Sequence, residues 1–369
     1  MRKLVLLALV VAFASSATPA TAAEPYWVEQ LGLPQAWRVS EGAGVRVGLI
    51  DTGVTAEPDL AGAVLPGADF PDLGAPTGDA IGHGTTMALL IAGRGISGGT
   101  RGVAPKAEIL PARLNGGADE AIAAVRWAVD QGAKVVNISL GNGSGHSDAY
   151  DEALNYARDH DVVVVAAAGN AGEDTGVTSP ADRPGVLAVS AVDRTGKFSE
   201  DVSVSGPEVS FAAPGVDIST SRTGEKAPTS GTSQAAALVS GVVALVRSRY
   251  PDLTAAQVTD QLAGTAKDFG TPGRDSLYGF GLIDPVAALA KPPAPGAKAG
   301  AGGSSWWWIA GIGLLAVLVI AAWAWRRRAR GPKPGRSLSA SAKAPAGRGP
   351  GRRPGKPSRH WNSSASPRR

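Results

Sequence analysis

Residues 162–170 read VVVVAAAGN, an unbroken apolar run that ends in a polar turn. A strand with one face in water alternates apolar and polar residues, whereas a run without polar positions is typical of a strand buried on both faces. Such strands belong mainly to parallel sheets, whose two faces are covered by helices. The stretch therefore predicts a strand inside a parallel sheet.

Further runs of strand length lie on both sides of it, namely VRVGLI (45–50), KVVNISL (134–140) and VLAVSAV (186–192). Helical patterns lie around and between them at 84–93, 118–132 and 147–161, and the last two start near Asp or Ser caps. This alternation predicts an α/β fold with a doubly wound, mostly parallel sheet flanked by helices. Ligands bind such sheets at the carboxyl ends of the strands.

Four polar residues stand at junctions of this kind. Asp51 and Asn170 follow strand runs, His83 lies at the mouth of a helix, and Ser233 opens an Ala-rich helix. A serine hydroxyl becomes a nucleophile when an imidazole takes its proton, and a carboxylate orients that imidazole. An Asn amide and a backbone N–H at a helix start would stabilise the resulting oxyanion. Taken singly, each residue also fits a structural role, such as a turn or, for Ser233, a helix cap.

The chain order Asp, His, Ser is that of subtilisin. The stretches DTGV (51–54), GHGT (82–85), AAAGN (166–170) and SGTSQAAA (230–237) resemble motifs of the subtilisin-like serine peptidases, and the likeness extends over nearly all of 24–290. The resemblance implies that Asp51 orients His83, that His83 is general base and acid, that Ser233 is the nucleophile and that Asn170 is the oxyanion donor.

The same resemblance implies polypeptide substrates. VNISLG (136–141) and VVVAAAG (163–169) are similar to the strands that flank a bound peptide in that family. The substrate contacts implied are Ser139, Leu140, Gly141, Ala167, Ala168 and Gly169. No cofactor is expected. Asp69, Asp72 and Asp79 do not have the spacing of a full calcium ligand set, so we predict solvated loop carboxylates and no metal site.

A narrower resemblance is to the mycosins, the membrane-anchored subtilases of type VII secretion systems. It is carried by residues 24–54, by GVAPKAEILPARL (102–114) and by a predicted C-terminal anchor. It implies subunits of a type VII secretion complex as partners. The chain departs from the usual subtilase pattern at Ala237, where Pro is common, and at Leu89, where Gly is common.

The two ends of the chain carry targeting signals. Residues 1–23 combine a positive start, an apolar stretch and small residues near the end, which predicts a secretory signal peptide. Residues 306–325 are uncharged, flanked by Trp and followed by Arg326–Arg328, which predicts one transmembrane helix with its C-terminal side in the cytoplasm. Residues 24–290 are then an extracytoplasmic peptidase domain, 291–305 a Pro/Gly-rich linker, and 326–369 a basic disordered tail.

Composition excludes several classes of protein. The chain contains no cysteine, so it has no disulfide and no cysteine nucleophile. Residues 326–369 hold 14 Lys or Arg and no Asp or Glu, which leaves 22 basic and 32 acidic residues, a net charge of about −10, in residues 1–325. We therefore expect no nucleic-acid binding by the folded part.

Two other functions compete with an anchored serine endopeptidase. One is a structural subunit of a secretion complex, with incidental or no peptidase activity. The other is an esterase on a related sheet, which the absence of a G-x-S-x-G elbow around Ser233 disfavours.

Overall fold

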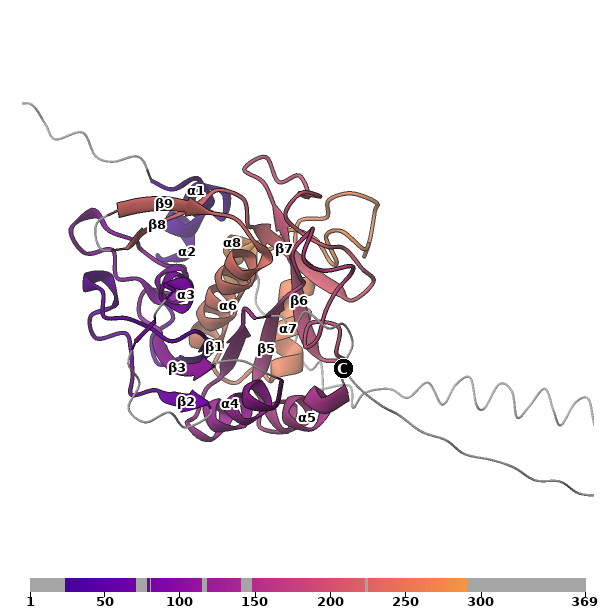
Figure 1. The fold of residues 1–369 in the computed structure, drawn as a ribbon. Coiled ribbons are helices and arrows are strands. Elements are labelled where there is room, and N and C mark those ends of the chain that lie inside the picture. The colour runs from indigo at the N-terminus through magenta and orange to yellow at the C-terminus, as the bar shows by residue number, and fades with distance from the viewer. Residues whose placement is uncertain are drawn as a thin grey trace, which may run out of the picture. The chain divides into compact units, whose positions relative to one another are not determined.

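Seven parallel strands form the centre of the protein (Figure 1). The structure is a computed structural model that describes residues 24–70, 78–79, 81–114, 118–140, 148–222 and 225–290. The sheet order is β2 (Ala68–Phe70), β3 (Glu108–Leu114), β1 (Arg46–Asp51), β4 (Val135–Ile138), β5 (Val163–Ala167), β6 (Val186–Val192) and β7 (Val209–Pro214). The predicted α/β class with a mostly parallel sheet is confirmed.

Helices cover both faces of this sheet. In Figure 1, α4 (Ala118–Asp130) and α5 (Asp151–Asp159) lie together on one side, and α3 (His83–Ala92) and α6 (Thr232–Arg249) lie on the other. Along β5, Val163 and Val165 pack into the core that contains α3 and α6, whereas Val164 and Ala166 pack into the core under α4 and α5. Each buried valine contributes about 1.5–3 kcal/mol. The apolar run is unbroken because both faces of the strand are buried.

The remaining described elements are shorter. They are α1 (Tyr26–Gln30), α2 (Leu33–Ala36), α7 (Ala255–Ala263), α8 (Pro285–Ala290), the 3-10 turns η1 (Pro58–Leu60), η2 (Ile96–Gly98) and η3 (Asp148–Tyr150), and the antiparallel hairpin of β8 (Ile218–Arg222) and β9 (Glu225–Thr229).

The four predicted strand runs correspond to β1, β4, β5 and β6, and the predicted helices to α3, α4 and α5. The strand β3, which pairs directly with β1, was not predicted. Its sequence EILPARL carries Pro111 in the middle and charged residues near both ends, and proline is rare inside a sheet because it cannot donate a ladder hydrogen bond.

Helix α6 forms the core of the face that it covers, and nearly all of its residues are buried. Ala237 and Leu89, the two departures from the subtilase pattern, are both fully buried, the first inside α6 and the second inside α3. Alanine keeps its backbone N–H and favours helix, so α6 continues through Ala237 without a break.

The N-terminal arm, residues 24–36, is built into the fold. Trp27 is fully buried, and its indole Nε1 donates to the carbonyl oxygen of Ser219 at 3.2 Å. The Tyr26 hydroxyl donates to the carbonyl oxygen of Val216, and burial raises the pKa of Tyr26 to about 12, so the phenol keeps its proton at neutral pH. These bonds fasten the arm to β8 and to the segment that connects β7 to β8.

Across the described ranges, we find no helix that is both long enough and apolar enough to cross a membrane. The predicted signal peptide (1–23), linker (291–305), transmembrane helix (306–325) and tail (326–369) lie outside the described residues.

Candidate active site

Asp51 and His83 form a directly bonded pair at the carboxyl edge of the sheet. Asp51 is the last residue of β1 and is fully buried, and His83 is the first residue of α3. The His83 Nδ1 lies 2.7 Å from Asp51 Oδ1. Because the ionised carboxylate can only accept, Nδ1 carries the proton in this bond and Nε2 is left to exchange a proton with another group.

A glycine allows α3 to approach β1 this closely. A Cβ added at Gly84 would lie 2.2 Å from the carbonyl oxygen of Gly53 and 3.0 Å from Asp51 Oδ1. The first of these distances is far below van der Waals contact, so a side chain at position 84 would push the first turn of α3 away from Asp51. The GHGT motif therefore has a steric reason for its second glycine.

The surroundings of His83 favour its protonated form. Burial by itself would lower the pKa of His83, but the hydrogen bond to Asp51 and the charges of Asp51 and Asp79 outweigh that effect and raise the pKa above its ordinary 6.5. Asp51 Oδ1 also accepts the Thr52 N–H at 2.8 Å, while Oδ2 is buried and has no hydrogen-bond partner among the described residues. An imidazolium that forms beside Asp51 is thus stabilised.

Ser233 lies in the first turn of α6 and does not cap that helix. The N-cap position belongs to Gly231, and the Ser233 hydroxyl donates to the carbonyl oxygen of Ser139 at 3.0 Å. Helices α3 and α6 pack against each other. In the described residues no hydrogen bond joins Ser233 to His83. Catalytic hydrogen bonds are often formed only when substrate is bound.

Asn170 follows β5 and contacts the start of the same helix. Its Oδ1 accepts from the Thr232 backbone N–H and from the Thr232 hydroxyl, each at 3.1 Å. Its Nδ2 donates one hydrogen to Glu173 at 3.3 Å, and the amide has a second hydrogen to offer. The carboxamide is thereby fixed beside the residue that precedes Ser233.

The structure brings some of the predicted substrate contacts to this edge. Ser139 and Leu140 directly follow β4, and Ala167 ends β5. The backbones of Ala168 and Gly169 are already engaged within the protein: Ala168 N–H donates to Val189 and Gly169 N–H to the Thr232 hydroxyl. Gly141 lies outside the described residues. All six contacts remain predictions.

The acidic loop residues differ from the solvated carboxylates that we expected. Asp69 is buried and pairs with Arg113, whose Nε donates to Oδ1 at 2.9 Å. Asp79 binds the first turn of α3 through Thr85. Asp72 lies outside the described residues. In the part of the chain that the structure describes, no group of three or more His, Cys, Asp or Glu side chains is placed to hold a metal ion.

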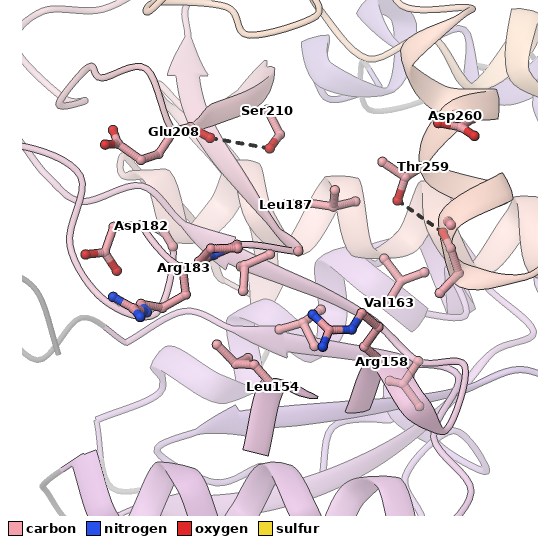
Figure 2. A pocket seen from close by; sticks show the side chains of 18 of the residues that line it. Leu154, Arg158, Val163, Asp182, Arg183, Leu187, Glu208, Ser210, Thr259 and Asp260 are labelled. Carbon is pink, nitrogen blue, oxygen red and sulfur yellow. Dashed lines mark hydrogen bonds between the residues drawn. The ribbon is translucent and has the colours of Figure 1, made fainter. Parts of the chain in front are cut away.

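A separate cavity of about 530 Å³ opens at the other edge of the sheet (Figure 2). It is lined by residues at the amino ends of β5, β6 and β7, including Val163, Leu187 and Ser210, and by Thr259 of α7. Arg183, which also lines the cavity, donates hydrogen bonds to the carboxylate of Asp151 on α5. Because Asp51, Asn170 and Ser233 stand at the opposite, carboxyl edge, this cavity is not part of the candidate site.

Comparison with known proteins identifies the family. Residues 42–281 match the profile of the Subtilase family. The chain belongs to this family of serine peptidases. It is 40% identical to the thermostable alkaline protease of Halalkalibacterium halodurans over 248 residues, which are 66% of each chain. It is 35% identical to Mycosin-3 of Mycobacterium tuberculosis over 326 residues, covering 70% of each chain.

Solved mycosin structures share the fold of this subtilase. The structure of MycP1, described as a serine protease and an essential component of the type VII (ESX-1) secretion system, matches with a TM-score of 0.66 and 35% identity. The match covers 74% of this chain and 91% of MycP1. The relationship to the mycosins expected from the sequence is therefore confirmed.

Sequence reasoning missed the polar side chains that surround the Asp51–His83 pair. Asp79 accepts hydrogen bonds from the hydroxyls of both Thr52 and Thr85 at the first turn of α3. A signal was available, because Thr52 and Thr85 lie inside the DTGV and GHGT motifs and Asp79 lies four residues before His83.

Proposed function

We propose that this subtilase is an extracytoplasmic serine endopeptidase in which Asp51, His83 and Ser233 form the catalytic triad. The observation that supports it most directly is the 2.7 Å bond between His83 Nδ1 and the buried Asp51, which leaves Nε2 as a proton acceptor. Ser233 contributes a hydroxyl from the first turn of a helix that packs against α3.

In the proposed reaction the Ser233 hydroxyl turns from the Ser139 carbonyl oxygen toward His83. Its proton passes to Nε2 as Oγ attacks the carbonyl carbon of the scissile peptide bond. Asp51 stabilises the imidazolium. The bond between Oγ and carbon forms and the carbonyl π electrons move to oxygen, which gives a tetrahedral oxyanion.

Two donors are proposed for that oxyanion. One is the second Nδ2 hydrogen of Asn170, whose carboxamide is fixed by Thr232. The other is the backbone N–H of Ser233, one of the first four N–H groups of α6, which lack an intrahelical acceptor. The N-terminal end of α6 also carries partial positive charge. Such donors are worth about 3–4 kcal/mol each in comparable sites.

Collapse of the oxyanion expels the amine, which takes its proton from His83, and leaves an acyl group on Ser233. A water molecule then gives a proton to His83 and attacks the acyl carbon, and Ser233 leaves as its hydroxyl. Polypeptides are the proposed substrates, and no cofactor takes part in these steps.

Membrane attachment and secretion are further parts of the proposal. They are supported by the targeting signals at 1–23 and 306–325 and by the likeness to mycosins. We propose that residues 24–290 form the peptidase domain outside the cytoplasm, and that type VII secretion subunits are partners. A purely structural role in such a complex is the alternative, and it would not need an activated Ser233.

A fluorophosphonate probe, which labels activated serines, tests the triad. We expect the wild-type chain to be labelled and Ser233→Ala to lose all labelling. Ser230→Ala is the matched control, because Ser230 is exposed and lies three residues earlier, and among the described residues its hydroxyl accepts the Asp217 N–H and makes no other hydrogen bond. If folded wild-type protein is not labelled, the triad is not formed, and the structural alternative takes its place.

A further inference from the structure

The carboxylate of Asp79 accepts an unusual number of hydrogen bonds for a loop residue. Its Oδ1 accepts from the Thr52 hydroxyl and the Gly82 N–H, both at 2.8 Å, and from the Ile81 N–H at 3.3 Å. Its Oδ2 accepts from the N–H and the hydroxyl of Thr85, both at 2.8 Å. Burial raises the pKa of Asp79, but these bonds outweigh burial and lower the pKa below its ordinary value, so the side chain is ionised at neutral pH.

Two of the bonds hold the first turn of α3. The N–H groups of Gly82 and Thr85 stand at the N-terminus of a helix that begins with His83, and the N-cap Gly82 has no side chain with which to cap it. Asp79 therefore does the work of a capping residue from three positions upstream, with a negative charge at the positive end of the helix.

A third bond connects Asp79 to the strand that carries Asp51. The Thr52 hydroxyl donates to Asp79 and accepts the Gly84 N–H at 3.0 Å, while the Thr52 N–H donates to Asp51 Oδ1 at 2.8 Å. Thr52, which Asp79 binds, is next to Asp51, and Gly82, whose N–H Asp79 also binds, is next to His83. One carboxylate thus binds the chain neighbours of both members of the Asp51–His83 pair.

We propose that Asp79 is a positioning residue of the peptidase site, which clamps the end of β1 to the start of α3 and so fixes the contact between Asp51 and His83. The role rests on the proposed triad, but it concerns a residue outside that triad. Without the clamp, the N–H groups of Gly82 and Thr85 would lose their acceptor. The first turn of α3 would then be joined to the end of β1 and the residues after it by the Asp51–His83 bond, by the contact of Thr52 with Gly84 and by the Thr55 N–H, which donates to the Thr85 hydroxyl.

The charged groups near His83 support an electrostatic part of the same role. Asp51 on β1 and Asp79 in the preceding loop both raise the pKa of His83. The side chain of Arg113 on β3 also reaches this region, close to Gly53, but its guanidinium is paired with Asp69. Asp79 is therefore a second negative charge that acts on the imidazole without touching it.

Histidine titration followed by NMR tests the proposal directly on the full chain. The chain has four histidines, and His83→Ala assigns the signal of His83. Asp79→Asn removes the charge and places an NH₂ group against N–H donors. We expect the midpoint of the His83 titration to fall by about half a pH unit or more. We also expect kcat to fall about tenfold or more, with a smaller change in KM. Asp79→Glu restores the charge and should return the midpoint toward that of the wild type.

Asp193→Asn is the matched control. Asp193 likewise accepts the N–H and hydroxyl of one threonine, Thr195, and a further N–H from Lys197, but it lies in the turn after β6. This variant should leave the His83 titration unchanged. If Asp79→Asn fails to fold, Thr52→Val removes the bridging hydroxyl instead and should lower kcat about fivefold or more.

A folded Asp79→Asn variant overturns the proposal if the midpoint of its His83 titration is unchanged and its kcat stays within twofold of the wild-type value. A loss of thermal stability with an unchanged His83 titration also overturns it, since that pattern shows a purely structural residue. Because the titration needs no substrate, it gives its answer even if Ser233 proves unreactive. A failure of the proposed triad is thus distinguished from a failure of the Asp79 proposal.

Discussion

At the scale of single residues, the proposed chemistry depends on one carboxylate and one imidazole. The carboxylate of Asp51 raises the pKa of His83, and only the neutral imidazole can take the Ser233 proton. Activity should therefore rise with pH as His83 loses its proton, and the midpoint should lie above the 6.5 of an unperturbed histidine. The measurement is kcat/KM against pH on a peptide substrate.

Asp51→Asn should change both the height and the midpoint of that profile. The amide cannot hold Nδ1–H in the same way and carries no charge, so kcat should fall by a factor on the order of 10⁴. Any remaining activity should have its midpoint at lower pH, because the attraction that raised the pKa of His83 is gone. A variant that keeps more than a tenth of wild-type kcat would contradict the role given to Asp51.

At the scale of elements, the site depends on how closely α3 approaches β1. Gly84→Ala tests this, because helix propensity alone would favour alanine by about 1 kcal/mol, whereas a Cβ 2.2 Å from the Gly53 carbonyl oxygen should cost about 1–3 kcal/mol or more. We expect a lower free energy of unfolding in urea and a kcat reduced about 100-fold. Gly176→Ala is the control, since a Cβ there meets no atom within 4 Å.

The elements also show which parts of the fold a sequence pattern can predict and which it cannot. A strand such as β5 can be predicted because burial on both faces leaves an unbroken apolar run. Since ligands bind parallel sheets at the carboxyl ends of the strands, the ends of these runs also point to Asp51 and Asn170, and the structure has both residues at that edge of the sheet. The strand β3 was missed because Pro111 and its charged ends hide a buried strand. The sequence predicts Asp79 as a solvated loop residue, because a sequence does not show that its loop folds back over the start of α3.

At the scale of the whole molecule, the chain combines an acidic folded part with a basic C-terminal tail, and 306–325 lies between them. About 20 helical residues at 1.5 Å each span about 30 Å, the thickness of the hydrocarbon core of a bilayer. The Arg cluster that follows directly favours the cytoplasmic side. We expect the full chain to stay in the membrane pellet after alkaline carbonate extraction.

A chain that ends at Ser305 is the control for that experiment, and it should appear in the soluble fraction with its fluorophosphonate labelling intact. Orientation is measured separately, with a tag after Arg369 and protease added outside intact cells. The tag should be protected while residues 24–290 remain accessible, because the positive flank holds the tail inside. Recovery of the full chain in the carbonate supernatant would show that 306–325 does not anchor it, and digestion of the tag in intact cells would show the opposite topology.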